Sequence, residues 1–77
     1  MIIKEFHIDT IRRAIGHELM LVRWQKGITQ KQLADKFHLP PKYIDRTEIG
    51  RYTHLSLIKK LLLFYNKEIR IELIDKQ

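Results

Sequence analysis

The side chains of this sequence that point most clearly to a binding function are basic. Fifteen Lys and Arg residues stand against nine Asp and Glu residues, which gives a formal net charge of +6. Lys42 and Arg46 are spaced so that both project from one face of a helix, and such side chains can donate hydrogen bonds to guanine O6 and N7. The surplus suits a polyanionic partner, of which nucleic acid is the commonest. A basic surface kept for solubility is the alternative, and charge alone does not decide between them.

Catalytic and metal-binding chemistry finds little support in the sequence. The chain has no cysteine, which excludes disulfides, thiolate zinc sites and cysteine nucleophiles. Its histidines lack the spacing of metal ligands, and no serine lies in a nucleophile-elbow motif. No pair of carboxylates suggests acid–base catalysis. We therefore expect no enzyme activity, no metal and no cofactor.

The helices that must position the basic residues can be predicted from caps and breakers. Asp9 or Thr10 is the predicted N-cap of a first helix, whose apolar stripe ends before Gly27. Thr29 is predicted to cap a second helix that runs through Phe37.

Two further helices are predicted after a proline break. Pro40 cannot continue the second helix, whereas Pro41 fits the first turn of a third helix that runs to about Ile49. A fourth helix is predicted from Leu55 to about Asn66. The second and third helices are short and joined by a tight turn, and such a pair can place its second helix in the major groove of DNA.

The two ends of the chain have a different pattern. Residues 2–8 are rich in β-branched and aromatic side chains and predict a short strand or an extended arm. Residues 68–73 alternate between charged and apolar, which predicts a β-strand over residues 68–75. The predicted fold class is therefore mainly α: four helices with a C-terminal β-strand, with or without a short N-terminal strand. We expect a single domain over residues 1–77, with the helical core in residues 9–66.

Two sequence runs indicate a known family. RWQKGITQKQLA is followed at the right interval by YIDRTEIG, and Ile15-Gly16 and Leu19 precede them. From Ile15 to Tyr65 the chain resembles the Cro/cI-type helix-turn-helix domain of the XRE family. The resemblance implies a lambda-repressor-like fold of four helices that binds double-stranded DNA.

The resemblance also assigns roles to individual residues. The base-reading positions are those at the start and on the exposed face of the third helix: Pro41, Lys42, Tyr43 and Arg46. Contacts to the DNA backbone are expected from the start of the second helix and from the loop after the third: Thr29, Gln30, Lys31, Arg51, Tyr52 and His54. Arg23 and Glu48 match a buried ion pair that ties the first helix to the end of the third. A plain structural role remains open for Gln30, as a solvated residue, and for Tyr43, as packing against the second helix.

Three positions affect the turn, the packing or the charge of the predicted third helix. His38 stands where the family usually has a turn glycine, often at positive φ, which histidine tolerates better than most residues. Thr47 stands where an aliphatic core residue is usual, and its hydroxyl can bond back to a helix carbonyl. Asp45 puts a negative charge near the DNA, where it would serve to reject wrong sequences or to orient a neighbouring side chain.

The C-terminal strand and the apolar surplus of the fourth helix predict a subunit interface. Ile69, Ile71 and Leu73 share one face of the strand, which would pair with the same strand of a second subunit. Residues 2–8 could instead supply the partner strand within the chain. A domain of this family followed by one strand resembles HipB-like antitoxins, which implies a HipA-like kinase toxin as a partner.

The expected function is that of a transcriptional repressor which binds a palindromic operator as a homodimer. A phage or mobile-element regulator without a toxin is one alternative, and a protein-interaction adaptor that does not read DNA is another. The start of the chain does not resemble a signal peptide, and the apolar stretch from Leu55 to Tyr65 is too short to span a bilayer. We expect a cytoplasmic, nucleoid-associated protein without membrane contact.

Overall fold

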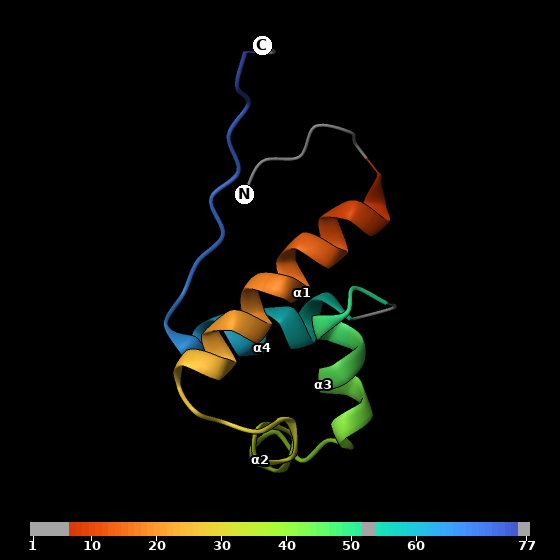
Figure 1. The fold of residues 1–77 in the computed structure, drawn as a ribbon, viewed down its shortest axis with the longest axis vertical. Helices are drawn as coiled ribbons and strands as arrows, with labels where there is room; N and C mark the ends of the chain where they lie inside the picture. The colour runs from red at the N-terminus through yellow and green to blue at the C-terminus, as the bar shows by residue number, and fades with distance from the viewer. Residues whose placement is uncertain (1–6, 52–53, 76–77) are drawn as a thin grey trace.

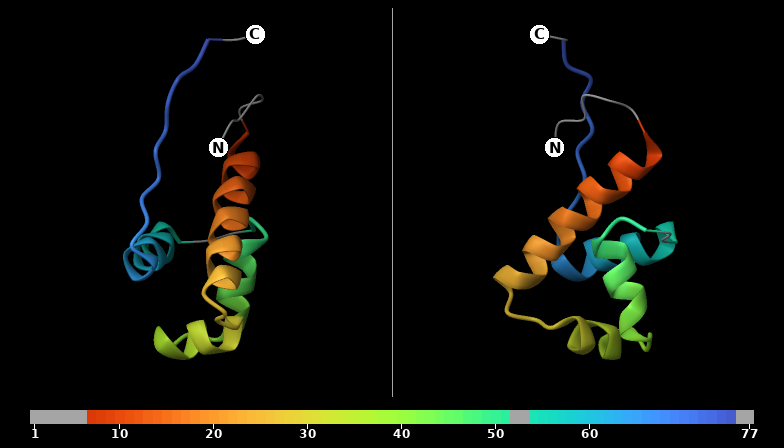
Figure 2. Two further views of the ribbon diagram at one scale, coloured as in Figure 1. Left: turned by 60° about the vertical axis from the view of Figure 1, so that its left-hand side comes forward. Right: turned by 45° about the vertical axis from the view of Figure 1, so that its right-hand side comes forward.

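The computed structural model of the chain describes residues 7–51 and 54–75, and over these residues the chain forms four α-helices (Figure 1). They are α1 (Ile8–Gln25), α2 (Gln30–Lys36), α3 (Pro41–Glu48) and α4 (Leu55–Tyr65). α1 crosses the body of the molecule, and α2 lies at the end remote from the C-terminal segment (Figures 1 and 2). Among the described helices, none combines the length and the apolar character that a membrane span requires.

α1 begins earlier than the sequence predicts. Its N-cap is His7, at φ −130° and ψ 142°, and no side chain caps the helix there. The predicted caps Asp9 and Thr10 lie inside the first turn, so the predicted start is wrong. Asp9 instead pairs with Arg12 across 3.7 Å, and its negative charge is favourable at a helix N-terminus. At the other end the chain leaves the helix through Gly27, as predicted, with a φ of +67°.

Local hydrogen bonds fix the start of α2 and the turn that follows it. Thr29 caps the helix: its hydroxyl accepts from the main-chain nitrogen of Gln32 at 3.0 Å, and the Gln32 side chain accepts from the Thr29 nitrogen at 2.9 Å. His38 takes the positive φ that its place in the turn predicts, at +56°. Leu39 then donates its N–H to the carbonyl oxygen of Ala34 at 2.9 Å, which satisfies a carbonyl left open at the helix end.

The hydrophobic core lies where α2 and α3 meet. Ala34 and Ile44 are fully buried, and Leu33 is 1% exposed. The small side chain of Ala34 lets the two helices approach closely, and each large side chain buried here contributes about 1.5–3 kcal/mol to stability. Side chains from α1 and α4 complete the core: Leu19, Leu57, Leu61 and Tyr65. The body is therefore a single packed unit with α3 on one side of it (Figure 1).

α1 and α3 come into backbone contact at Gly16. A Cβ atom on this residue would lie 2.7 Å from the carbonyl oxygen of Glu48 and closer still to that of Thr47. Both oxygens belong to the last turn of α3, whose buried side chains hold it in place. Glycine is required here by the close approach of a neighbouring backbone, and this contact sets the distance between α1 and α3.

The C-terminal segment corrects the predicted fold class. Asn66 ends α4 with a φ of +55°, and residues 67–75 run away from the helices as exposed, extended chain without strand pairing (Figure 2). The β-strand predicted at residues 68–75 is therefore wrong for this structure, which is helical wherever it has regular secondary structure in the described residues. A strand needs unpaired N–H and C=O groups beside it, and helices bond theirs internally. The strand predicted at residues 2–8 falls mostly on residues 1–6, outside the described residues.

The contact at Gly16 makes a testable prediction. Gly16→Ala should destabilise the protein by about 1–3 kcal/mol, because the added methyl group forces α1 and α3 apart, although alanine favours a helix by about 1 kcal/mol over glycine. Urea unfolding measures the change, and His17→Ala at the exposed neighbouring position is the control, with an expected change below about 0.5 kcal/mol. A Gly16→Ala protein as stable as the wild type would show that the helices separate without cost.

Candidate nucleic-acid interface

α2, the following turn and α3 form a helix pair with one face of α3 open to solvent. Figure 1 shows α2 along its axis, whereas α3 lies closer to the plane of the view, so the two helices cross steeply. Pro41 occupies the first position of α3, where no hydrogen-bond donor is needed. Ile44, Thr47 and Glu48 are buried against the body. The other face of α3 is therefore available to a partner.

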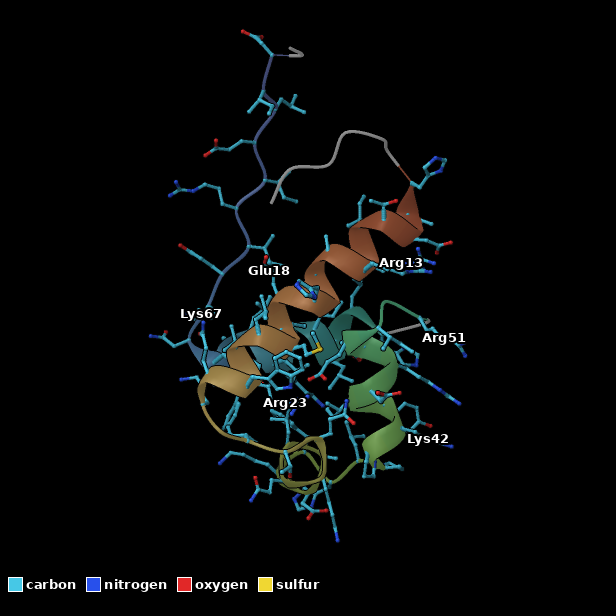
Figure 3. The ribbon with its side chains drawn as sticks, in the orientation of Figure 1. Arg13, Glu18, Arg23, Lys42, Arg51 and Lys67 are labelled. Carbon is cyan, nitrogen blue, oxygen red and sulfur yellow. The ribbon has the colours of Figure 1, made fainter. Side chains whose placement is uncertain are left out.

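The predicted base-reading residues all lie on this outer face. Pro41, Lys42 and Arg46 are exposed, and Tyr43 is 38% exposed. The Lys42 ammonium lies 5.5 Å from the centroid of the Tyr43 ring, within the range of a cation–π attraction. In Figure 3 the Lys42 side chain projects outward from α3. The structure thus brings the four residues to one surface.

Thr47 lies on the buried side of α3 and forms a hydrogen bond within the helix. Its side chain is almost inaccessible, and its hydroxyl donates to the main-chain carbonyl oxygen of Tyr43 at 2.7 Å. The back-bond predicted for this threonine is therefore present, and it satisfies a polar group that would otherwise be costly to bury.

A buried ion pair joins α1 to the end of α3. Arg23 Nε donates to Glu48 Oε2 at 2.6 Å and Nη2 donates to Oε1 at 3.0 Å, a two-pronged arrangement. Nη1 donates to the carbonyl oxygen of Ile28 at 2.9 Å, in the turn between α1 and α2. The hydrogen bond to Glu48 raises the pKa of Arg23 above its ordinary value, although burial acts in the opposite direction. One guanidinium thus connects α1, the α1–α2 turn and α3.

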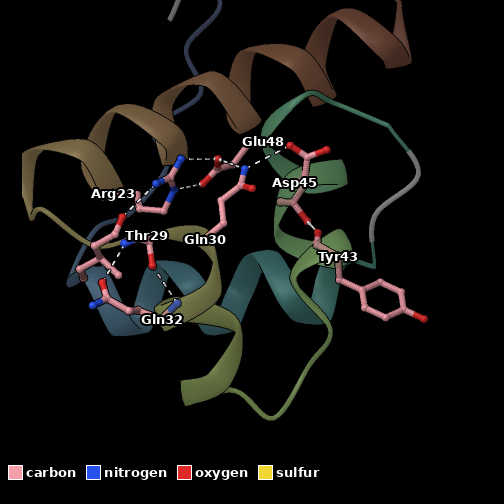
Figure 4. Close-up of polar contacts among 9 residues, drawn as sticks. Arg23, Thr29, Gln30, Gln32, Tyr43, Asp45 and Glu48 are labelled. Carbon is pink, nitrogen blue, oxygen red and sulfur yellow. Dashed lines mark hydrogen bonds and ion pairs between the residues drawn. The ribbon is translucent and has the colours of Figure 1, made fainter.

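Gln30 extends this network to the outer face of α3 (Figure 4). Its Nε2 donates to Glu48 Oε1 at 3.0 Å and to Asp45 Oδ1 at 3.1 Å. An amide nitrogen carries two hydrogens, so both are engaged by carboxylates. The family resemblance implies that this amide contacts a phosphate. For that contact the amide would have to break its hydrogen bonds to the two carboxylates. Sequence reasoning considered Gln30 and Asp45 separately and missed their contact, and nothing in their spacing signals it.

The other residues expected to contact the DNA backbone lie on α2 and between α3 and α4. Lys31 is exposed in the first turn of α2, and Arg51 is exposed three residues after the end of α3. Figure 3 shows Arg51 and Lys42 on the same side of the molecule. His54 is the N-cap residue of α4, while Tyr52 lies outside the described residues.

The residues predicted to form the dimer interface lie in the extended C-terminal segment. Ile71 and Leu73 are largely exposed, whereas Ile69 is partly covered. On α4, Leu55 and Leu63 also present their side chains to solvent. The structure therefore leaves apolar area uncovered on both α4 and the segment after it.

Comparison with known proteins identifies the family to which this geometry belongs. The family model described as helix-turn-helix matches residues 19–71, more than half of the chain. The chain therefore belongs to the XRE type of helix-turn-helix proteins, a family of DNA-binding transcription regulators. No curated protein and no solved structure matches it. In the described part of the chain no group of acidic and histidine side chains is arranged to hold a metal ion.

The ion pair makes a prediction about stability. Glu48→Ala should destabilise the protein by about 3–5 kcal/mol, because it leaves the Arg23 guanidinium buried without its carboxylate. The double variant Arg23→Met/Glu48→Leu should cost less, since it removes both charges. Thermal unfolding followed by circular dichroism compares them, with Glu18→Ala on the exposed face of α1 as the control. An unchanged midpoint in Glu48→Ala would contradict the structural role of the pair.

The charges of the ion pair affect the pKa of Tyr65 on α4. Its side chain is 2% exposed, and its hydroxyl has no hydrogen-bond partner within the described residues. Burial raises the pKa of Tyr65 to about 12, the Glu48 carboxylate adds to the rise, and the charge of Arg23 opposes it. The folded protein therefore holds this phenol in its neutral form.

The raised pKa of Tyr65 makes the protein sensitive to alkali. The unfolded chain loses this proton near pH 10, whereas the folded protein keeps it until about pH 12. Stability from this group is complete below about pH 10 and declines toward pH 12, by up to about 3 kcal/mol. In urea unfolding measured across this range, Tyr65→Phe should remove that part of the decline, whereas Tyr43→Phe should keep it. Identical pH profiles for wild type and Tyr65→Phe would refute this assignment.

Proposed function

We propose that the protein is a sequence-specific transcriptional repressor that reads the major groove of DNA with the outer face of α3. The observation that carries the proposal is the exposed pair Lys42 and Arg46 on a helix whose other side is locked by the buried Glu48. Both basic side chains can donate to guanine O6 and N7. A rigid helix fixes the direction in which they are presented, which discrimination between base pairs requires.

Contacts to phosphates would orient the domain on the duplex. Lys31 on α2 and Arg51 in the segment after α3 are basic and exposed, and the chain carries a net charge of +6. Each neutralised phosphate releases counterions and adds affinity without sequence preference. These residues would therefore position α3, while the outer face of α3 supplies specificity.

The repressor is proposed to act as a homodimer on a palindromic operator. Leu63 is 73% exposed on α4, and the apolar residues of the C-terminal segment, among them Ile71 and Leu73, are also uncovered. Burying these side chains against a second copy would remove apolar area from water, and a two-fold dimer matches an inverted repeat in DNA. A dimer bound over a promoter, in the cytoplasm, would exclude RNA polymerase from it.

The antitoxin subtype does not enter this proposal. It depended on a C-terminal β-strand, and the described chain has none. A regulator of a phage or mobile element would use α3 in the same way, and an adaptor that does not read DNA would have no sequence preference at all.

Selection of bound duplexes from random-sequence DNA tests the function. The wild-type protein should enrich one sequence with inverted half-sites, and Arg46→Ala should lose about 1–3 kcal/mol of discrimination against the wrong base at one position in each half. The control is Lys67→Ala, which removes the same charge on the opposite side of the molecule from Lys42 (Figure 3). Binding without enrichment by the wild type would contradict the proposal and favour the adaptor.

A further inference from the structure

We propose that Asp45 reads a base, accepting a hydrogen bond from the exocyclic amino group of a cytosine, and that Gln30 is the positioning residue that holds its carboxylate for this contact. The inference rests on the proposed function of α3 and adds a specificity-determining residue to it. Asp45 lies on the exposed part of α3, next to Arg46 and one turn after Lys42. Its side chain therefore belongs to the surface that would enter the major groove.

The carboxylate of Asp45 is held by a chain of bonds that begins in the core. Arg23 fixes Glu48, Glu48 Oε1 accepts from Gln30 Nε2 at 3.0 Å, and the same nitrogen donates to Asp45 Oδ1 at 3.1 Å (Figure 4). The amide can face these two groups only through its nitrogen, because ionised carboxylates accept and do not donate. Gln30 therefore holds Oδ1 of Asp45, and this bond leaves the second oxygen of the carboxylate, Oδ2, for another donor.

The donors and acceptors on the base edges in the major groove determine which base can donate a hydrogen bond to this carboxylate. Guanine presents O6 and N7, and thymine presents O4, which are acceptors that would repel it. Cytosine presents only the N4 amino donor at this edge, whereas adenine places the acceptor N7 beside its N6 donor. A carboxylate that approaches adenine thus meets a lone pair as well as a hydrogen. In a base pair the cytosine N4 donor has an acceptor on one side only, the O6 of the paired guanine, whereas the adenine N6 donor lies between two acceptors, its own N7 and thymine O4. Cytosine therefore offers Asp45 the less hindered donor.

A negative charge on this surface needs such a partner. A carboxylate close to DNA is repelled by the phosphates, and the exposed position of Asp45 gives it no role in the core. The charges of Lys42, one turn before Asp45, and of Arg46, the next residue, lower the local repulsion because both are cationic. The repulsion is offset by a hydrogen bond at a cytosine and remains uncompensated at other bases, which is how a repulsive element generates specificity.

The test measures base discrimination with the duplex that the wild-type protein selects. The base pair read by Asp45 is identified as the operator position at which Asp45→Ala loses its base preference. Replacing the cytosine there by 2-pyrimidinone, which lacks the N4 amino group, should weaken wild-type binding about 10- to 150-fold, the range for one hydrogen bond to a charged group, and leave Asp45→Ala binding unchanged. Asp45→Asn should shift the preference at this position from cytosine to adenine, because an amide pairs with both N6 and N7 of adenine.

Two further variants separate reading from positioning and from charge. Asp35→Asn removes a carboxylate from an exposed position on α2 and should leave every base preference unchanged. Gln30→Ala should reduce discrimination at the position that Asp45 reads and at no other position. Thermal unfolding of each variant verifies that it is folded at the temperature of the binding measurements.

The outcomes distinguish this inference from the function on which it rests. The inference is overturned if Asp45→Ala keeps the wild-type base preference at every position. It is also overturned if Asp45→Ala binds all duplexes more tightly by the same factor, because Asp45 would then act only through its charge. If the wild type selects no sequence, the proposed function itself fails. A selected operator whose cytosine tolerates 2-pyrimidinone without loss overturns the base contact and leaves the function of Lys42 and Arg46 standing.

Discussion

Arg23 and Glu48 lie 25 residues apart in the sequence and meet in a buried, two-pronged ion pair. Removing two charges from water costs several kcal/mol per ion, and the pair is stable only because further hydrogen bonds satisfy its polar atoms. Here the carbonyl oxygen of Ile28 and the amide of Gln30 supply them. α1, the turn between α1 and α2, the start of α2 and the end of α3 are therefore coupled through one electrostatic contact, since each of them contributes a polar group to it.

Two different constraints act on the last turn of α3. The backbone contact at Gly16 sets how close α3 lies to α1, and the bonds of Glu48 set the rotation of α3 about its own axis. With Ile44 and Thr47 turned inward, that rotation directs Lys42 and Arg46 outward. The direction of the outer face thus follows from contacts on the buried face, which is why an α-helix of two turns can present side chains rigidly.

The features that depend on near neighbours in the sequence could be predicted. The cap at Thr29, the positive φ of His38 and the proline start of α3 are set by local chemistry. The start of α1 was misplaced, because His7 begins the helix without a side-chain bond that a sequence pattern could indicate. The strand predicted at residues 68–75 is wrong, because an alternation of charged and apolar residues shows only that a segment is compatible with a strand. A strand also requires a second strand with which its backbone groups can pair. The bond between Gln30 and Asp45 follows from the packing of α2 on α3, which no spacing encodes.

If α3 reads DNA as proposed, its mixed charges counter a problem that the basic surplus creates. A helix that carried only Lys and Arg would gain affinity from phosphates at any sequence, because counterion release is blind to the bases. A carboxylate among them lowers the affinity for every DNA sequence by a similar amount, and only a base edge with a hydrogen-bond donor restores the lost affinity. The discrimination is the difference in binding free energy between sites with and without that donor. A mixed charge pattern therefore exchanges affinity for specificity, and the exchange is effective only if the carboxylate cannot swing away, which the bonds from the buried ion pair through Gln30 oppose.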